Sequence, residues 1–369
     1  MMQKTSTIIF SGDIGLTFHC GEAENLFSMD VLRCINSADA LCINLELPFV
    51  ENTFRMAPYT HPSLISSTEF APLLQKLNPA VVNIGTNHCM DGGKEGIKLT
   101  RSILEEIGAC SIGAGSNENE ARKPCFITIR ETRFGFLSFC KKGNFTASRE
   151  KPGAALLSEA NLKIDIPEAR KRCDFLIVSM HIGMEFSKSV HPVYRDLTHL
   201  AVDLGASCVI GHHPHVIQGI ETYQGIPIFY SLGNFLFDNY AGAVSYKGYW
   251  EDRHKGILAK VFFSSSEISY EVIPVMYTSR PLAVRIAQEA DAEAIISEVI
   301  SLSAIISAGI DEISAEVDAV EAIAKREIAT IIVLTRIHGL RFLWHFVKDL
   351  KLRHFRMMFR AVCRRMTSK

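Results

Sequence analysis

The stretch Ser207-Cys-Val-Ile-Gly-His-His-Pro-His215 decides the expected fold of this chain. A short apolar run ends at Gly211 and is followed by three histidines within four positions. The preceding residues, 203–206, are typical of a helix end that turns into a buried strand, so the histidines are expected just beyond its carboxyl end. In extended backbone, residues i and i+2 point the same way, and we therefore expect His213 and His215 to face one metal-binding point. The alternative is a solvated, histidine-rich turn.

The composition is that of an ordinary globular protein. Of the 369 residues, 47% are hydrophobic and 21% are charged, and the net charge of −1 gives no general attraction to nucleic acid. The charge is unevenly distributed, because residues 336–369 contain ten Lys and Arg residues and one acidic residue. We therefore expect no nucleic-acid partner, and a basic C-terminal end.

Cysteine usage and the N-terminal residues indicate a cytoplasmic protein. The ten cysteines are scattered through apolar runs without a CxxC pair, which favours buried free thiols over disulfides. The first strand is expected from Thr7, which leaves no room for a signal peptide. No uninterrupted apolar stretch reaches the roughly 18–20 residues that a membrane-spanning helix needs.

Strand and helix patterns alternate along residues 7–277, which predicts an α/β sandwich built on mixed sheets. Residues 126–130 and 134–139 are expected to form a β-hairpin. The other expected strands lie at 7–10, 40–43, 79–84, 174–179, 207–211, 226–230, 256–263 and 268–276. Helices are expected at 22–38, 68–77, 94–107, 166–173 and 194–204.

The pattern changes after Pro281, so we divide the chain into a domain at 1–280 and a helical extension at 281–369. Residues 286–327 are expected to form one or two long helices, and 336–362 a further, amphipathic helix with a basic side. Two interpretations of this last helix remain. It packs on the acidic helices before it, or it contacts anionic lipid or another protein.

Five apolar runs end in a residue suited to metal binding or acid–base chemistry. In open α/β sheets, ligands gather at the carboxyl ends of strands, so these residues are expected to share one edge. They are Asp13, Glu46, Asn87-His88, His181 and His213/His215. Together they predict a metal site. His212 is not expected to be a ligand, because neighbouring side chains in a strand diverge.

These residues also carry a family resemblance. The succession of short motifs around them resembles the CapA family of capsule and poly-γ-glutamate synthesis proteins, which have a calcineurin-like metallophosphatase fold. The resemblance spans about residues 7–277 and implies a four-layer α/β/β/α sandwich with a dinuclear metal centre. The motifs are Gly12-Asp13, Asn44-Leu-Glu46, Thr86-Asn-His-Cys-Met-Asp91, His181-Ile-Gly-Met-Glu185, Gly211-His-His-Pro-His215 and Tyr230-Ser-Leu-Gly-Asn-Phe-Leu-Phe-Asp238.

The resemblance implies a ligand set for two divalent ions, with Mn, Fe or Zn suited to the mixed oxygen and nitrogen donors. Asp13 and His215 would bind the first ion, Glu46 would bridge, and Asn87, His181 and His213 would bind the second. Two ions about 3.5–4 Å apart can hold a hydroxide nucleophile and polarise a phosphoryl oxygen. The wider superfamily usually has a histidine two residues after the first aspartate, whereas this chain has Gly15, so the first ion has fewer protein ligands.

Four further residues have two interpretations each. His88 is expected to protonate the leaving oxygen or to contact the transition state. Asp91 orients the His88 ring or caps the following helix. Glu185 contacts substrate or supports the site, or is a plain surface carboxylate; Asn234 lies beside the site, or only completes a tight turn.

The expected function is that of a metal-dependent phosphoesterase-type hydrolase in capsule or exopolymer biosynthesis, acting on an anionic or polymeric substrate. One alternative is an amide hydrolase or transferase acting on a γ-glutamyl polymer. The other is a non-catalytic scaffold of a polymer-synthesis complex. Many CapA proteins have an N-terminal membrane anchor, and this chain shows none. Residues 336–369 are expected to supply contact with polymer-synthesis proteins or with the membrane surface instead.

Overall fold

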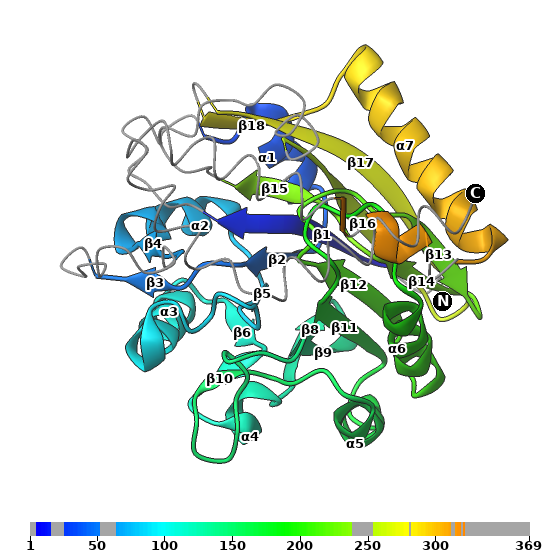
Figure 1. The fold of residues 1–369 in the computed structure, drawn as a ribbon. Coiled ribbons are helices and arrows are strands. Elements are labelled where there is room, and N and C mark those ends of the chain that lie inside the picture. Colours follow the sequence, from blue (N-terminus) through cyan, green and yellow to red (C-terminus); the bar gives the residue numbers. More distant parts are fainter. Residues whose placement is uncertain are drawn as a thin grey trace, which may run out of the picture.

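Two β-sheets packed face to face form the centre of the molecule (Figure 1). The computed structural model describes residues 5–15, 26–51, 64–237, 254–279, 282–310, 314–318 and 320–321. The first sheet has the strand order β18-β17-β16-β1-β2-β5-β6, and β15 also pairs with β1. Its strands are β1 (Ser6–Gly15), β2 (Ala40–Leu45), β5 (Val81–Asn83), β6 (Cys110–Ile112), β15 (Asn234–Phe237), β16 (Lys255–Phe263), β17 (Ile268–Ser279) and β18 (Leu282–Ile286).

The second sheet has the order β13-β14-β12-β11-β9-β8. Its four central strands, β14, β12, β11 and β9, are parallel, and an antiparallel strand lies at each edge. The predicted hairpin is present as β8 and β9. The strands are β8 (Cys125–Ile129), β9 (Thr132–Cys140), β11 (Phe175–His181), β12 (Cys208–His212), β13 (Ile220–Tyr223) and β14 (Ile226–Phe229).

Helices cover both outer faces, which confirms the predicted four-layer α/β/β/α sandwich with mixed sheets (Figure 1). Helices α1, α2 and α3 share one apolar cluster with the first sheet, and α5 and α6 share another with the second. A third cluster, which includes Phe10, Phe136 and Ile177, fills the space between the sheets. The helices are α1 (Met29–Asn36), α2 (Ala71–Leu77), α3 (Gly93–Glu106), α4 (Glu118–Ala121), α5 (Glu159–Arg170), α6 (Pro192–Asp203) and α7 (Glu289–Ala308).

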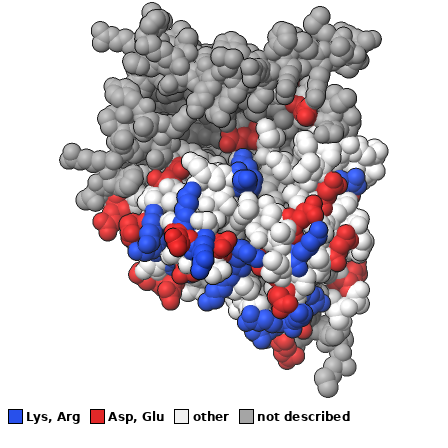
Figure 2. All heavy atoms as spheres, turned by 60° about the horizontal axis from the view of Figure 1, so that its bottom comes forward, with Lys and Arg blue, Asp and Glu red and all other residues white. Residues whose placement is uncertain are grey.

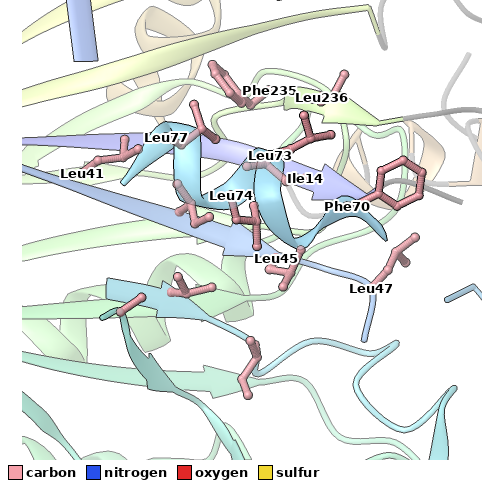
Figure 3. Packing of buried hydrophobic residues seen from close by; sticks show 14 of the residues in the cluster. Ile14, Leu41, Leu45, Leu47, Phe70, Leu73, Leu74, Leu77, Phe235 and Leu236 are labelled. Atoms are coloured by element: carbon pink, nitrogen blue, oxygen red, sulfur yellow. The ribbon is translucent and has the colours of Figure 1, made fainter. Parts of the chain in front are cut away.

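Helix α2 illustrates how sequence spacing produces this packing. Its apolar residues Leu73, Leu74 and Leu77 recur at helical spacing, and all three are buried. They lie over β1 and β2, where Leu41 and Leu45 belong to the same cluster (Figure 3). Burial of each leucine side chain stabilises the fold by about 1.5–3 kcal/mol. The helix ends at Asn78, which adopts the left-handed conformation (φ 50°).

The chain beyond residue 280 continues the first sheet before it becomes helical. β18 pairs with β17, and α7 packs near β13 and β17. The long helix expected over 286–327 is present as α7, with further helical residues at 314–318. The amphipathic helix expected at 336–362 lies outside the described residues, and the division at residue 280 stays a prediction. Among the helices that the structure describes, none is long and apolar enough to cross a membrane.

The prediction of free thiols is wrong for one pair. Cys110 begins β6 and Cys125 begins β8, and the structure joins them in a disulfide with their Cα atoms 6.5 Å apart. These strands form one edge of each sheet, so the pairing depends on how the two sheets stack, which cysteine spacing does not reveal. The six other described cysteines are free, as expected; they are Cys34, Cys42, Cys89, Cys140, Cys173 and Cys208.

Short elements and ion pairs complete the outer surface. Figure 2 brings forward the end where α4, α5 and β10 (Gly153–Ala154) lie, and there acidic and basic side chains are intermixed. One pair joins Arg122, just after α4, to Asp165 of α5 at 2.7 Å. The remaining short elements are β3 (Phe49–Val50), β4 (Ser66–Ser67), η2 (Thr68–Phe70) and β7 (Ala114–Gly115).

A cluster of hydrogen bonds and ion pairs links α6 to the second sheet. Glu221 of β13 lies 2.8 Å from Arg195 Nη2, 2.9 Å from His199 Nε2 and 2.7 Å from the Tyr230 hydroxyl. Burial opposes ionisation of Glu221. The hydrogen bonds from Arg195, Tyr230 and His199 outweigh burial and lower its pKa from 4.5 to about 2. A carboxyl group whose pKa is lower in the folded protein than in the unfolded chain stabilises the fold at pH values above its ordinary pKa. This stabilisation is lost as the pH falls towards the pKa of the folded protein.

We therefore expect Glu221→Gln to lower the free energy of unfolding at pH 7 by about 1 kcal/mol, since solvent screens a partly exposed carboxylate. The difference from the wild type should shrink as the pH falls from 4.5 to about 2. Urea unfolding at pH 7 and pH 3 measures both effects. Glu159→Gln, which removes an exposed partner of Lys163, is the matched control and should change little. A pH-independent difference for Glu221→Gln would contradict the prediction.

Candidate metal centre

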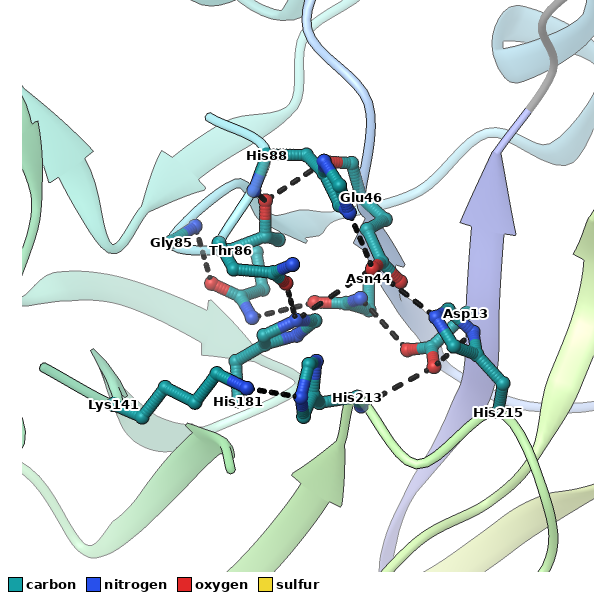
Figure 4. Close-up of polar contacts among 12 residues, drawn as sticks. Asp13, Asn44, Glu46, Gly85, Thr86, His88, Lys141, His181, His213 and His215 are labelled. Atoms are coloured by element: carbon teal, nitrogen blue, oxygen red, sulfur yellow. Dashed lines mark hydrogen bonds and ion pairs between the residues drawn. The ribbon is translucent and has the colours of Figure 1, made fainter. Parts of the chain in front are cut away.

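The strand ends meet at one edge of the sandwich, as predicted (Figure 4). Asp13 lies near the end of β1, and Glu46 directly follows β2. From the second sheet, His181 is the last residue of β11, and His213 and His215 follow β12. β1 and β2 are parallel to each other, and so are β11 and β12, so the carboxyl ends of the strands in each pair coincide.

These five residues form two groups that share one carboxylate. Asp13, Glu46 and His215 offer ligand atoms that all lie within 4.8 Å of one another. Glu46, His181 and His213 do the same. All five side chains are buried. Glu46 therefore lies between two potential cation positions, which is the arrangement expected for a bridging ligand.

The chemistry of Glu46 fits a bound cation. Its Oε1 atom lies 3.4 Å from His215 Nε2 and 3.7 Å from His181 Nε2. Both carboxylate oxygens are buried, and neither accepts a well-formed hydrogen bond from the described residues. His181 Nδ1 is also buried without a hydrogen-bond partner among them. Buried polar atoms left in this way are costly and rare, and a metal ion would supply the missing interaction of the Glu46 oxygens.

The electrostatics of the pocket favour the protonation states of Glu46 and His181 that a cation would need. Burial opposes ionisation of Glu46, but the positive charge of nearby histidines, above all His215, lowers its pKa to about 2. Burial lowers the pKa of His181 well below its ordinary value, so its ring is neutral at pH 7. Burial and the charge of Glu46 raise the pKa of Asp13 to about 8. A cation would therefore find an ionised Glu46 and a neutral His181, and it would displace a proton from Asp13.

The backbone at the histidines differs from the extended alternation that we expected. β12 ends at His212, and both His213 (φ 100°) and His215 (φ 59°) have positive φ. This conformation is strained for side chains larger than glycine, and such strain is concentrated at functional sites. It turns His213 towards the group with His181 and His215 towards the group with Asp13. The prediction that both rings face one point through i, i+2 alternation is therefore wrong in its geometry.

His212 lies outside both groups, and Asn87 lies beside the second one. His212 belongs to neither ligand group; its Nε2 lies 3.1 Å from the Ser11 carbonyl oxygen, and its Nδ1 lies 3.4 Å from Ser179 Oγ. Asn87 Oδ1 lies 2.7 Å from His181 Nε2, so its amide is beside the second group.

A row of buried amides holds Asp13, and sequence reasoning missed it. Asn44 Nδ2 donates to Asp13 Oδ1 at 2.8 Å, and Asn83 Nδ2 donates to Asn44 Oδ1 at 2.6 Å. Ser138 Oγ then donates to Asn83 Oδ1 at 2.6 Å, which links the first sheet to β9 of the second. Both asparagines stand at strand ends in the sequence, and this position was the available signal. The row fixes the orientation of the Asp13 carboxylate.

His88 and Asp91 lie together at the opening of the pocket. His88 Nδ1 is 2.9 Å from Asp91 Oδ2. On its other side, His88 Nε2 is 3.9 Å from Glu46 Oε1, and these two residues face each other in Figure 4. The His88 side chain is 21% exposed, unlike the buried ligand candidates. Gly92, not Asp91, is the N-cap residue of α3, and Asp91 Oδ2 also accepts a hydrogen bond from the Leu64 amide. Of the two interpretations of Asp91, the geometry favours orientation of the His88 ring.

Asn234 and Glu185 border the same pocket. Asn234 pairs with Asp13 across β15 and β1, and its Oδ1 lies 2.9 Å from His215 Nδ1. Glu185 is half-buried on the loop after β11, close enough to His88 to raise the pKa of its ring. On that loop, Lys188 Nζ lies 2.7 Å from Glu298 Oε1 of α7, so the helix after β18 helps to hold the loop in place.

Lys141 is a site residue that the sequence did not indicate. It directly follows β9, and its Nζ is within hydrogen-bond distance of His213 Nε2 (Figure 4). In the sequence, Lys141 and Lys142 resemble an ordinary solvated loop after a strand, and no spacing links them to His213.

Comparison with known proteins gives a consistent result. A family model described as "Bacterial capsule synthesis protein PGA_cap" matches residues 7–239. The chain is 36% identical over 184 residues to the PGA biosynthesis protein CapA of Bacillus subtilis (strain 168), which covers 47% of each protein. It is 28% identical over 247 residues to the capsule biosynthesis protein CapA of Bacillus anthracis, which covers 63% of this chain and 60% of that protein. The matched region thus spans about half to three fifths of the length of these relatives.

Among solved structures, a hypothetical protein from Thermus thermophilus aligns with a TM-score of 0.46 and 13% identity, over 73% of this chain and 99% of that chain. The family model covers well over half of the sequence, and Asp13, Glu46, His181, His213 and His215 all fall within it. The chain therefore belongs to the bacterial capsule synthesis protein family PGA_cap.

Proposed function

We propose that this protein is a metal-dependent hydrolase of the phosphoesterase type that acts in the synthesis of a capsule or a related polymer. The observation that carries the proposal is Glu46, a buried carboxylate shared by two groups of potential ligands. A structural site for one ion needs no shared ligand, whereas paired ions bridged by a carboxylate are typical of hydrolytic centres.

Two divalent cations would be held by side chains of both sheets. Asp13, Glu46 and His215 would hold one, and Glu46, His181 and His213 the other, with the Asn87 amide beside it. Mixed carboxylate and imidazole donors suit Mn, Fe or Zn. When bound, such ions supply Lewis acidity and make water more acidic, which is the chemistry that hydrolysis of a phosphoester requires.

His88 would supply the proton that the leaving oxygen needs. Burial lowers its pKa, but the hydrogen bond to Asp91 and the charges of Glu46 and Glu185 outweigh burial, so the pKa is raised overall. The hydrogen bond with Asp91 uses Nδ1 of the His88 ring, so the other ring nitrogen, Nε2, faces Glu46. His88 can therefore donate a proton from Nε2 while Asp91 holds the ring in position.

The relatives named for capsule and PGA biosynthesis support a place for this chain in polymer synthesis. A substrate in such a process is anionic or polymeric, and it would enter from the side of His88 and Glu185. Contact with polymer-synthesis proteins, or with a membrane surface through residues 336–369, belongs to the same proposal.

Metal binding tests the shared ligand. We expect metal-free wild-type protein to take up two Mn²⁺ or Zn²⁺ ions per chain. Glu46→Gln should weaken both sites strongly, since it removes the charge that they share, whereas His181→Ala should weaken only one. His212→Gln is the matched control, because this buried histidine lies outside both groups. Equilibrium dialysis with elemental analysis gives the stoichiometry. Binding of neither ion, or full binding by Glu46→Gln, would disprove the metal centre.

Turnover tests His88. We expect His88→Ala to retain metal and to lower kcat on diphenyl phosphate by about 10²–10⁴-fold, the range of general acid catalysis, because the leaving phenolate is basic enough to need a proton. Asp91→Asn should lower kcat less, by roughly tenfold, because the ring remains but is held less well. Glu95→Gln, on the exposed side of α3, is the control.

The same proteins should be assayed on a γ-glutamyl p-nitroanilide. Cleavage of the anilide alone, with dependence on metal, would replace the phosphoesterase proposal by amide hydrolysis. Retained metal without turnover of either substrate would favour a scaffold.

A further inference from the structure

Lys141 places a cation directly against a potential metal ligand. Its backbone amide donates to the His181 carbonyl oxygen at 3.2 Å, so the start of its side chain is fixed beside β11. From there the side chain extends to His213, where Nζ meets Nε2 (Figure 4). Lys141 is half-buried, so the ammonium lies at the border between the pocket and solvent.

The contact conflicts with metal binding for a chemical reason. A neutral imidazole has one nitrogen with a lone pair, and the other nitrogen carries a proton. A lysine ammonium has donors only, so its hydrogen bond to Nε2 uses that lone pair. A metal ion bound by His213 needs the same lone pair. If the ion binds through Nδ1 instead, Nε2 carries the proton and cannot accept from the ammonium.

We infer that Lys141 holds His213 in the metal-free protein, is released when the metal binds, and then binds the anionic group of the substrate. This inference rests on the proposed function and assigns to Lys141 the recognition of a phosphoryl or carboxylate group. After its release from His213, the Lys141 side chain still extends from the end of β9, so its ammonium remains near the group that contains His181 and His213. A lysine there acts as a mobile point charge on a flexible four-carbon chain.

The position of Lys141 also complements that of His88. His88 approaches Glu46 from the loop after β5, and Lys141 approaches His213 from the end of β9. The proton donor and the anion-binding residue would therefore come from different sheets. An anion bound at the ions would lie between the two, and the charge-assisted hydrogen bond from Lys141 would hold one of its oxygens.

Chemical labelling tests the release of Lys141 without any assay of activity. Brief acetylation of metal-free and Mn²⁺-loaded protein, followed by peptide mass spectrometry, reports how accessible each lysine is. We expect acetylation of Lys141 to rise several-fold on loading. The neighbouring Lys142 is exposed and is the internal control, so its labelling should not change.

The affinities for Mn²⁺ and for phosphate test the two proposed roles of Lys141, which are to hold His213 and to bind the substrate anion. Lys141→Met keeps the apolar chain and removes the charge, so it should bind Mn²⁺ about tenfold more tightly, because a competing cation is lost. In the Mn²⁺-loaded form it should bind inorganic phosphate at least about tenfold more weakly. Lys141→Arg should retain most of the phosphate affinity, and Lys142→Met should match the wild type. Parallel titrations with glutarate show whether the recognised anion is a phosphoryl or a carboxylate group.

The possible failures are distinguishable. If wild-type protein binds no Mn²⁺, the proposed function and the role of Lys141 are both overturned. If the metal binds, but labelling of Lys141 does not change and Lys141→Met binds both anions as the wild type does, only the inference about Lys141 is overturned. If Lys141→Met does not fold, the inference about Lys141 is still tested, because labelling of the wild-type protein by itself shows whether Lys141 is released.

Discussion

The burial of one negative charge is the constraint on which the rest of this structure depends. Glu46 is 1% exposed, and an isolated carboxylate in such a place is strongly disfavoured unless positive charge surrounds it. Imidazoles from three separate segments approach its Oε1 atom, which lies 3.4, 3.7 and 3.9 Å from His215, His181 and His88. These distances are too long for good hydrogen bonds and leave room for a cation between the groups. The pocket is therefore arranged around an interaction that the protein atoms alone do not complete.

The fold produces this arrangement through the direction of its strands. Parallel strands in both sheets bring their carboxyl ends to one edge, and the apolar layer between the sheets brings the two edges together. The register of β1 against β2 shifts between Phe10 and Asp13, and its register against β15 shifts after Asp13. Such irregularities redirect a side chain at the end of a strand. The Asp13 amide donates to the Gly233 carbonyl oxygen at 2.9 Å, so the turn before β15 completes the position of this carboxylate.

The sequence predicted those features of the fold and site that depend on local pattern. β-rich runs followed by Asp, Glu or His identify the carboxyl ends of strands. Five such ends meet in space because parallel strands bring their carboxyl ends to the same edge of a sheet. Features that depend on how distant segments stack were not predictable. The disulfide between Cys110 and Cys125 joins the edges of two sheets, and Asn83 reaches Ser138 across 55 residues. The positive φ of His213 and His215 was missed because this strained backbone is stable only in the folded surroundings, and a local sequence pattern does not specify it.

Under the proposed function, the candidate ligands by themselves would not determine which bond is cleaved. Two cations bridged by a carboxylate serve phosphoesters and amides alike, since both reactions need an activated water and a polarised oxygen. Discrimination must come from the residues at the opening, and these lie on three different loops: His88 after β5, Lys141 after β9 and Glu185 after β11. The last loop is tied to the chain beyond β18, because Glu298 pairs with Lys188 at 2.7 Å and with Lys255 of β16 at 2.7 Å. The opening of the pocket is therefore positioned by loops and by the packing of α7, whereas the buried candidate ligands are positioned by the strand ends of the two sheets.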